Sequence, residues 1–218
     1  MRLPTFRSPW RGAAPRASLA LLVTLVLAPA LALAQSPPIG VWAGLTQATF
    51  RGSDAPGPTY LAGFSAGIFT RVGLASRLSL QPELNYAQKG SDEVDLLADG
   101  SAYAMHIRLH YIEVPVLLRG EAPAVGPFTP FALLGPEVAF KAGCGLVVDG
   151  LSGSYSCSSL PAAKSVDYGG VIGGGVTVKL GGRTYGAAIR YDAGAADTFE
   201  GNNARNRAVT ISLGTMFR

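Results

Sequence analysis

Hydrophobic and polar residues alternate along most of the chain. In "LSLQPELNYAQKG", residues 78–90, the leucines and Tyr86 fall on one face of an extended strand. Glu83, Asn85 and Lys89 fall on the other face. A period of two predicts a β-strand. It leaves open which face is buried, because a soluble sheet turns its apolar face inward, whereas a transmembrane barrel turns it toward lipid.

Eight segments with this alternation are predicted to form strands, at residues 40–50, 60–74, 76–89, 105–119, 128–141, 166–180, 183–195 and 205–217. Most are longer than the about 9–11 residues with which a tilted strand crosses a bilayer. The chain beyond residue 34 has no apolar run of about 18 residues, so no transmembrane helix is expected there.

The links between these segments alternate in length. "LAS", "EAPAVGP" and "GG" are short turns, whereas residues 90–104 and 142–165 are long and polar or Gly/Ser-rich. Short turns at one end, long loops at the other and an even number of strands are typical of outer-membrane barrels. We therefore predict an all-β fold over residues 39–218, an eight-stranded antiparallel up-and-down transmembrane β-barrel with a polar, filled interior.

The pattern also predicts irregular strand pairing. Within residues 105–119 the apolar face changes after Tyr111 from the odd-numbered to the even-numbered positions. A one-residue change of phase is typical of a β-bulge. Pro82, Pro115 and Pro136 cannot donate to a β-ladder, so bulges or loosened pairing are expected there.

Aromatic residues gather near the ends of the predicted strands. With a periplasmic start to the first strand, the short-turn end carries Phe128, Tyr185 and Phe217. The long-loop end carries Tyr60, Tyr86, Phe140, Tyr168 and Tyr191. Two aromatic levels predict the girdles that barrels place at the two membrane interfaces.

The first 34 residues differ from the rest and predict a secretory signal peptide. Four arginines precede the apolar run "ASLALLVTLVLAPALALA", which ends in the small-x-small sequence Ala32–Ala34. Such a basic start, apolar middle and small-residue site predict cleavage between Ala34 and Gln35. A transmembrane anchor is the alternative, but Pro29 interrupts the run.

Overall charge does not indicate a nucleic-acid partner. The chain has 18 basic and 14 acidic residues, and removal of the four arginines in the first 34 residues makes the two numbers equal. The pI of about 9.2 therefore reflects the export signal, and no nucleic-acid binding is expected. Charged residues make up 15% of the chain, below the usual about 25%.

Cys144 and Cys157 are the two cysteines of the chain. An exported protein with an even number of cysteines favours a disulfide, which would contribute about 3 kcal/mol in the chain-entropy model. A metal site is the sharper alternative, but neither a CxxC pair nor a nearby histidine accompanies them. We expect neither a metal nor a cofactor.

The inward faces of the predicted strands carry many charges. They include Glu83, Lys89, Arg108, Glu113, Glu137, Asp167, Lys179, Arg190 and Asp192. An eight-stranded barrel is just wide enough to be filled by side chains, and unpaired buried charges are costly. A polar network of ion pairs is predicted, without an open pore. Paired carboxylates can perform acid–base chemistry, but a filled barrel leaves no room for a substrate.

His106 and His110 raise the alternative of an enzyme. Four residues along a strand span about 13 Å at about 3.3 Å per residue, too far for both side chains to bind one metal ion. Either histidine can act alone, with Ser101 or Asp99 of the neighbouring link as a partner. Nothing in the sequence fixes such a triad, so no catalytic residue is predicted.

Three stretches resemble the PorT-like outer-membrane β-barrel family: "LQPELNYAQKG" at 80–90, "LHYIEVPVLLRG" at 109–120 and "PFALLGPEVAF" at 130–140. The resemblance implies a small barrel of the OmpA/OmpX kind. It also implies a carboxyl-terminal aromatic residue that the barrel-insertion machinery reads. Phe217 matches this signal, although Arg218 follows it. The family implies fold and location, and says little about molecular activity.

The expected function is non-enzymatic, a structural or loop-mediated binding role in the outer membrane. The expected partners are outer-membrane lipid, the insertion machinery and an extracellular partner bound through residues 90–104 and 142–165. We expect a monomer. The alternatives are a lipid-modifying enzyme, an accessory barrel of a secretion apparatus and a secreted ligand-binding barrel of the lipocalin type.

Overall fold

The computed structural model describes residues 37–55, 59–96, 102–148, 154–156, 163–201 and 203–217. Residues 37–218 form one compact unit. The predicted signal peptide and its cleavage site at Ala34 and Gln35 lie outside the described residues. Within the described ranges, no helix is both long enough and apolar enough to cross a membrane.

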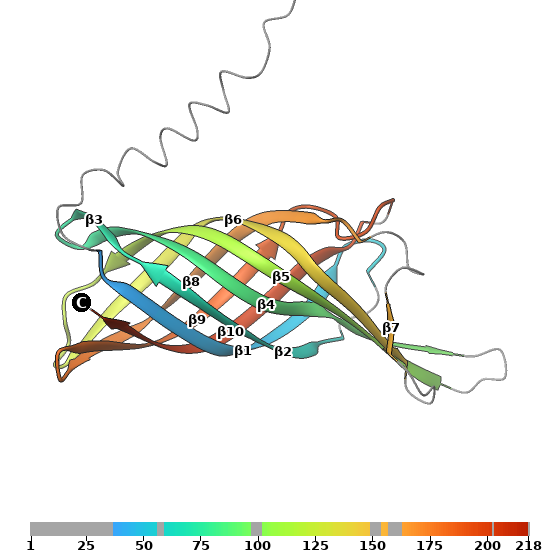
Figure 1. Cartoon of the computed structure of the whole chain (residues 1–218), viewed down its shortest axis with the longest axis horizontal. Helices are drawn as coiled ribbons and strands as arrows, with labels where there is room; N and C mark the ends of the chain where they lie inside the picture. The colour runs from blue at the N-terminus through green and yellow to red at the C-terminus, as the bar shows by residue number, and fades with distance from the viewer. Residues whose placement is uncertain are drawn as a thin grey trace, which may run out of the picture. The chain divides into compact units, whose positions relative to one another are not determined.

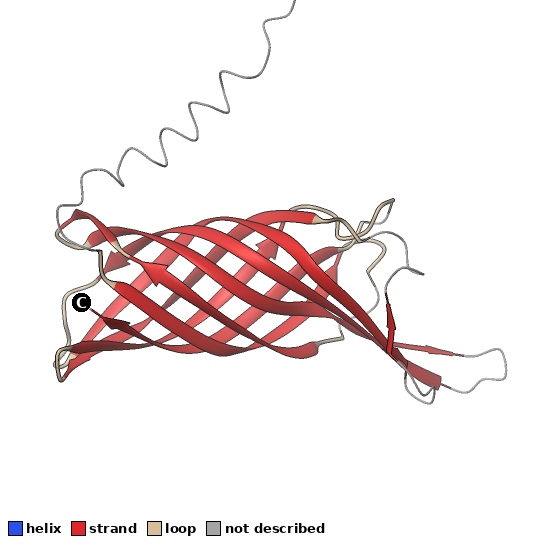
Figure 2. Cartoon of the chain, in the orientation of Figure 1, coloured by secondary structure: helices blue, strands red, loops and turns tan. Residues whose placement is uncertain are grey.

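Strands make up nearly all of the described chain (Figure 2). They are β1 (Ile39–Arg51), β2 (Leu61–Thr70), β3 (Val72–Ala75), β4 (Leu78–Leu96), β5 (Ala102–Glu121), β6 (Phe128–Val148), β7 (Ser154–Ser156), β8 (Val166–Leu180), β9 (Arg183–Gly194) and β10 (Arg205–Phe217) (Figure 1).

The strands close into the predicted eight-stranded antiparallel barrel. Each wall strand pairs with its neighbour in sequence, β10 pairs with β1, and β2 pairs with β4. β3 continues β2 after a break at Arg71 and pairs with the same strand, β4. The short β7 pairs with the end of β6. Because the ring is closed, the barrel wall has no free edge to pair with another chain.

The two predicted long links are partly wrong, because β4, β5 and β6 continue into them. β4 runs to Leu96 and β5 begins at Ala102, so most of the predicted link 90–104 is a two-stranded ribbon. β6 reaches Val148 and pairs with β7 inside the predicted link 142–165. The ribbons extend beyond the rest of the barrel (Figure 1, right). The sequence of these ribbons lacks the regular apolar alternation of the wall strands, so it resembled a loop.

The apolar face of the barrel wall points outward, as predicted for a membrane barrel. Leu45, Ile211 and Leu213 are 76%, 65% and 70% exposed, whereas Glu83 and Lys89 are 4% and 5% exposed. This is the reverse of a soluble barrel. The lipocalin-type alternative, which requires a water-facing polar exterior, is therefore wrong.

The predicted phase change in residues 105–119 is also wrong. Burial alternates through β5 without interruption, so Ile107, Leu109 and Tyr111 point inward and Arg108 is exposed. The irregularity lies on β6, where His110 pairs with Gly143 and Tyr111 with Lys141.

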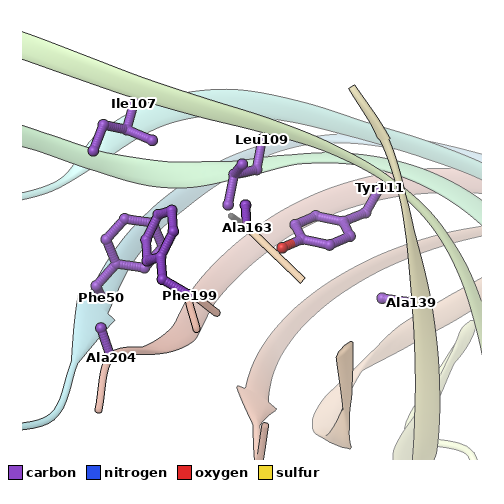
Figure 3. Close-up of a cluster of buried hydrophobic side chains, with 8 residues drawn as sticks. All are labelled: Phe50, Ile107, Leu109, Tyr111, Ala139, Ala163, Phe199 and Ala204. Atoms are coloured by element: carbon purple, nitrogen blue, oxygen red, sulfur yellow. The ribbon is translucent and has the colours of Figure 1, made fainter. Parts of the chain in front are cut away.

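Ile107, Leu109 and Tyr111 of β5 help to fill the long-loop end of the barrel with an apolar cluster (Figure 3). They pack there with Phe50, Phe199, Ala139, Ala163 and Ala204. The Phe50 and Phe199 rings meet edge to face, with centroids 5.5 Å apart. Apolar residues therefore occupy the inside of the barrel at this level, which the assumption of a polar interior missed.

Pairing is loosened at all three strand prolines, as predicted. Within the described ladders, β4 and β5 pair at Pro82–Val116 and resume at Asn85–Glu113. The β5–β6 ladder pairs at Pro115–Glu137 and resumes at Leu118–Leu134. The break between β2 and β3 lies opposite Pro82. The prolines thus form a row across β4, β5 and β6 where each removes a ladder donor.

Aromatic side chains occupy two levels of the outer face. At one end Phe128 pairs with Val178, which pairs with Tyr185. At the other end Ile112 separates Tyr86 from Phe140 across β5. The apolar band of the outer face lies between these two levels, as the predicted aromatic girdles require.

Candidate functional site: the filled barrel interior

A buried ion pair between Glu83 on β4 and Arg190 on β9 crosses the interior. Arg190 Nη1 and Nη2 donate to the two carboxylate oxygens of Glu83, at 2.7 and 3.1 Å. Gln81 Nε2 and Asn85 Nδ2 donate to the same carboxylate, at 2.6 and 3.0 Å. The Arg190 guanidinium also lies 4.5 Å from the Trp42 ring centroid. Bidentate geometry and extra donors are what a buried pair needs to offset its desolvation.

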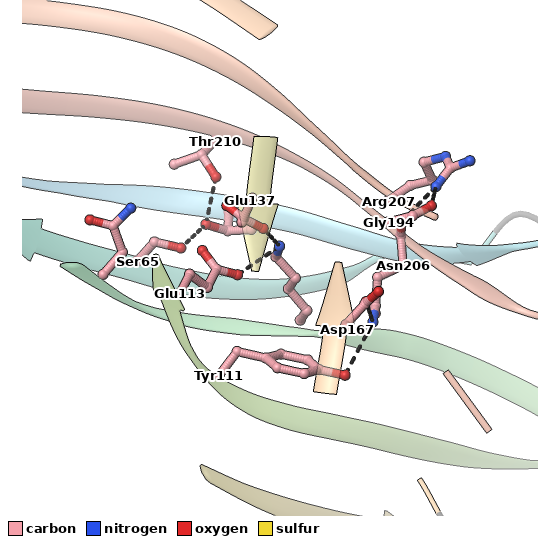
Figure 4. Close-up of polar contacts among 12 residues, drawn as sticks. Ser65, Tyr111, Glu113, Glu137, Asp167, Gly194, Asn206, Arg207 and Thr210 are labelled. Carbon is pink, nitrogen blue, oxygen red and sulfur yellow. Dashed lines mark hydrogen bonds and ion pairs between the residues drawn. The ribbon is translucent and has the colours of Figure 1, made fainter. Parts of the chain in front are cut away.

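Lys89 forms a second centre with carboxylates from neighbouring strands. Its Nζ lies 2.6 Å from Glu113 Oε1 on β5 and 3.3 Å from Glu137 Oε1 on β6 (Figure 4). Asp192 of β9 is also within electrostatic range of this ammonium group. One cation thus joins carboxylates of β5 and β6 to β4.

Further hydrogen bonds between side chains continue the network beside these charges (Figure 4). Asn206 Nδ2 donates to Asp167 Oδ2 at 3.0 Å and to the Tyr111 hydroxyl at 3.2 Å. Thr46 joins Ser65 and Thr210 through hydroxyl contacts of 2.7 and 2.9 Å. The Thr46 contacts link β1, β2 and β10, and the Asn206 contacts link β10 to β5 and β8. Both sets give buried polar groups a hydrogen-bond partner.

The structure places most of the predicted interior residues together inside the barrel. The buried members are Glu83, Lys89, Glu113, Glu137, Asp167, Arg190 and Asp192. The prediction that Arg108 lies inside the barrel is wrong, because the uninterrupted alternation of β5 places it on the outer face. Lys179 is exposed near the end of β8 and does not belong to the buried network.

Two interior arginines were missed or misplaced by the sequence pattern. Arg119, which is absent from the predicted interior set, is 1% exposed, with its guanidinium 3.4 Å from the Phe131 ring centroid. Its inward position follows from the phase of Ile107 once no bulge is assumed. Arg71 lies at the break between β2 and β3, where alternation stops, so no periodic signal marked it.

Both histidines lie on the outer face of β5 at the long-loop end. His106 Nδ1 is 2.8 Å from Asp92 Oδ1, and His110 Nδ1 is 2.5 Å from the Tyr86 hydroxyl. Ser101 and Asp99, the predicted partners, lie outside the described residues. Among the residues that are described, no three His, Cys, Asp or Glu side chains are grouped to hold a metal ion.

The remaining predicted sites lie on β6 and β10. Cys144 pairs with Leu109 across the β5–β6 ladder, and Cys157 lies outside the described residues, so the disulfide stays a prediction. Phe217 ends β10 opposite Ile39 of β1. Its ring is 39% exposed, and the Arg183 guanidinium lies 5.4 Å from its centroid.

Charged side chains are buried in the central section of the barrel. Glu83, Glu113 and Arg190 are all less than a tenth exposed. A water-filled passage would leave such side chains accessible to solvent, as in the wide porins. The Glu83–Arg190 pair joins β4 to β9 across the interior of the barrel.

Comparison with solved structures finds small barrels at low similarity. Neisserial surface protein A is 15% identical, with 82% of this chain and 96% of that chain covered and a TM-score of 0.48. The outer membrane protein OprG from Pseudomonas aeruginosa is 11% identical, with 84% and 97% covered and a TM-score of 0.42. Ail, the attachment invasion locus protein of Yersinia pestis, is 12% identical, with 84% and 99% covered and a TM-score of 0.40.

The comparison with protein families gives a direct assignment. No curated protein sequence matches the chain. The model of the outer membrane protein beta-barrel domain matches residues 33–200. That range contains every wall strand except β10. Together with the closed ring and its apolar outer face, the match shows that this chain belongs to the outer membrane protein beta-barrel domain family and resides in the outer membrane.

Proposed function

We propose that this protein is a closed, non-enzymatic outer-membrane barrel that acts through the hairpins at its long-loop end. The observation that carries the proposal is the buried network around Glu83–Arg190 and Lys89, which fills the section where a pore or a substrate site would lie. With the middle of the barrel filled, function falls to the surface that the barrel presents outside the cell. Outer-membrane barrels carry their longer loops on that side.

The two ribbons at this end provide the contact surface. The β4–β5 ribbon is paired as far as Leu96–Ala102, and β6 pairs with β7 up to Val147–Ser154. Paired backbone holds a projecting hairpin in a defined shape, which favours specific contact over a flexible tether. The predicted extracellular partner would therefore meet a preformed ribbon.

A complementation experiment distinguishes a structural role from a binding role. In a strain that lacks the gene, outer-membrane permeability to a hydrophobic dye is measured after supply of the parent chain or a variant with residues 92–106 replaced by a short Gly–Ser turn. Rescue by the parent only assigns the function to the ribbon, as proposed. Equal rescue by both contradicts the proposal and assigns the function to the barrel body. An unboiled-gel shift confirms that both chains are folded.

A lipid-modifying enzyme is the second candidate, and the His106–Asp92 contact favours it. A carboxylate that orients an imidazole is one part of a general-base arrangement. Hydrolysis of lipid A and of phospholipid by the purified protein tests this candidate. An activity that His106→Ala abolishes and His110→Ala retains would establish the enzyme and overturn the non-enzymatic proposal.

The finer likeness to PorT-like barrels supports an accessory role in secretion as an alternative. It rests on the resemblance of residues 80–90, 109–120 and 130–140, and is therefore an analogy at the level of the fold. Crosslinking in intact cells tests it. Reproducible crosslinks from the periplasmic turns to components of a secretion apparatus would support this alternative over the hairpin proposal.

A further inference from the structure

A cavity lies inside the barrel near its short-turn end. It is lined by Trp42, Phe69, Arg71, Arg119, Phe131 and Thr215, among others, and contains about 390 Å³ of space, its open mouth included. Thr215 lies near the end of β10, and Arg71 follows the end of β2. Short turns mark the periplasmic end of such barrels, so the cavity faces the periplasm.

Hydrogen-bond donors in this cavity lack acceptors. Arg119 Nη2 and Trp42 Nε1 are buried and have no hydrogen-bond partner among the described residues. Arg119 and Trp42 are 1% and 7% exposed. The guanidinium and indole N–H groups can only donate. Buried donors of this kind call for an occupant that offers acceptor atoms.

The cavity also carries an unbalanced positive charge. Arg71 Nη1 lies 3.6 Å from Glu121 Oε1, and Arg119 Nε donates to the same oxygen at 3.1 Å. One carboxylate therefore serves two guanidinium groups. The other cation of the lining, Arg190, is occupied by Glu83.

The three charged side chains differ in how far they are exposed to solvent. The side chain of Glu121 is 33% exposed, that of Arg71 14% and that of Arg119 2%. The Glu121 carboxylate is thus the group nearest to solvent, and the Arg119 guanidinium, with its unpartnered N–H, is the most deeply buried. The Phe131 ring covers one face of Arg119, which leaves the edge of the guanidinium for a ligand.

We propose that this cavity is a binding site for a compact anion, a carboxylate or phosphate group that enters from the periplasm. Arg119 Nη2 and Trp42 Nε1 donate to its oxygens, and Arg71 supplies the second positive charge. An anion offers only acceptors, matches the donor-only lining and neutralises the surplus charge. The site lies at the opposite end from the hairpins and does not depend on their function.

Titration of the intact protein, purified from the outer membrane in detergent, tests the site. The probes are sodium phosphate and sodium acetate, each exchanged for sodium chloride at constant ionic strength. The readout is the indole N–H resonance of Trp42, assigned by its loss in Trp42→Phe. A saturable shift with either anion supports the proposal, and the tighter of the two identifies the preferred group. The absence of a saturable shift with both overturns it.

Two variants separate a built site from general attraction. Arg119→Gln is expected to weaken binding at least tenfold, because it removes the charge and the bidentate donor edge. Arg77→Gln, at an exposed arginine of the same end, is expected to leave the affinity unchanged. Equal affinity in Arg119→Gln, or an equal loss in both variants, overturns the proposal. Where the gel shift shows Arg119→Gln unfolded, Arg71→Gln replaces it, and unchanged affinity there has the same meaning.

Free and lipid-borne phosphate are distinguished by a parallel titration with short-chain phosphatidic acid. The cavity lies inside the wall, so free phosphate is expected to bind more tightly. A tighter response to the lipid assigns its headgroup as the ligand of the same site. Failure of all three probes overturns the proposal, and it leaves the result of the complementation experiment unaffected.

Discussion

Adjacent residues of this chain meet opposite surroundings. Leu84 is 49% exposed on the outer face, whereas Glu83 beside it is 4% exposed inside. The alternation of a strand carries this contrast along the whole wall. Each substitution therefore has a consequence that depends on which side of the wall it faces.

Leu134→Arg is expected to destabilise the barrel through the lipid. Leu134 is 57% exposed and lies on β6 midway between Phe128 and Phe140 in sequence. A cation at the bilayer midplane costs about 2–4 kcal/mol. Guanidinium titration of folding into lipid vesicles measures the change in unfolding free energy. The control Leu74→Arg, near the short-turn end, is expected to cost about 0–1 kcal/mol, and equal costs for both would contradict the membrane facing.

Arg190→Met is expected to destabilise the barrel from inside. It leaves the Glu83 carboxylate, whose side chain is 0% exposed, without its cation. Breaking a buried pair in this way costs about 3–5 kcal/mol. The double variant Glu83→Gln with Arg190→Met should lose less than the sum of the single changes, because no unpaired charge remains.

Arg205→Met provides the surface control for this pair. Arg205 and Asp197 form an ion pair with side chains 43% and 37% exposed. Exposed pairs contribute about 0–1 kcal/mol, because water screens them. Urea titration in the same vesicles compares the two changes. A loss for Arg205→Met as large as that for Arg190→Met would show that burial of the central pair adds nothing.

At the scale of elements, the sequence predicted the wall strands because each must separate lipid from a polar interior. That requirement makes apolar and polar residues alternate in segments such as 166–180, which coincides with β8. It ends where the chain leaves the membrane, so the continuation of β4 to Leu96 carried no signal. The ribbon could not be distinguished from a loop by polarity alone.

The interior network was predictable for the same reason, except for Lys179 at the exposed end of β8 and Arg108 on β5. Glu83 and Arg190 lie on inward positions of regular strands, and alternation found both. Ile107 and Leu109 are apolar yet point inward, because the long-loop end is filled by the cluster around Phe50. Assigning them to lipid forced a phase change and turned Arg108 inward. A local pattern cannot show that the inside of a barrel changes from polar to apolar along its axis.

The last strand carries a prediction about assembly. Phe217 closes the ring beside Ile39, and the family resemblance makes it the residue that the insertion machinery reads. Phe217→Ala is expected to lower the fraction of newly exported chain that migrates as folded barrel in unboiled gels. Phe128→Ala, at the same level on β6, is the matched control. A similar loss in both variants would assign the effect to the aromatic girdle rather than to a terminal signal.

At the scale of the whole molecule, the barrel is closed in two senses. Its wall has no free edge, because β1 pairs with β10 and β2 with β4. Its central section is filled, because charges from β4, β5, β6 and β9 meet there. The first closure suits the chain to the bilayer, and the second is the basis of the proposal that the barrel does not conduct ions.

Conductance measurements follow from this second closure. The parent chain in a planar bilayer is expected to show no steady ion current. Replacement of Glu83, Lys89, Glu113 and Arg190 together by alanine removes the side chains that hold the centre, and should produce unitary conductance while the barrel retains its gel shift. A closed variant would mean that the apolar cluster around Phe50 and Phe199 seals the barrel by itself. A steady current through the parent chain would contradict the proposed non-conducting function outright, since ions need a water-filled path that the buried network does not leave.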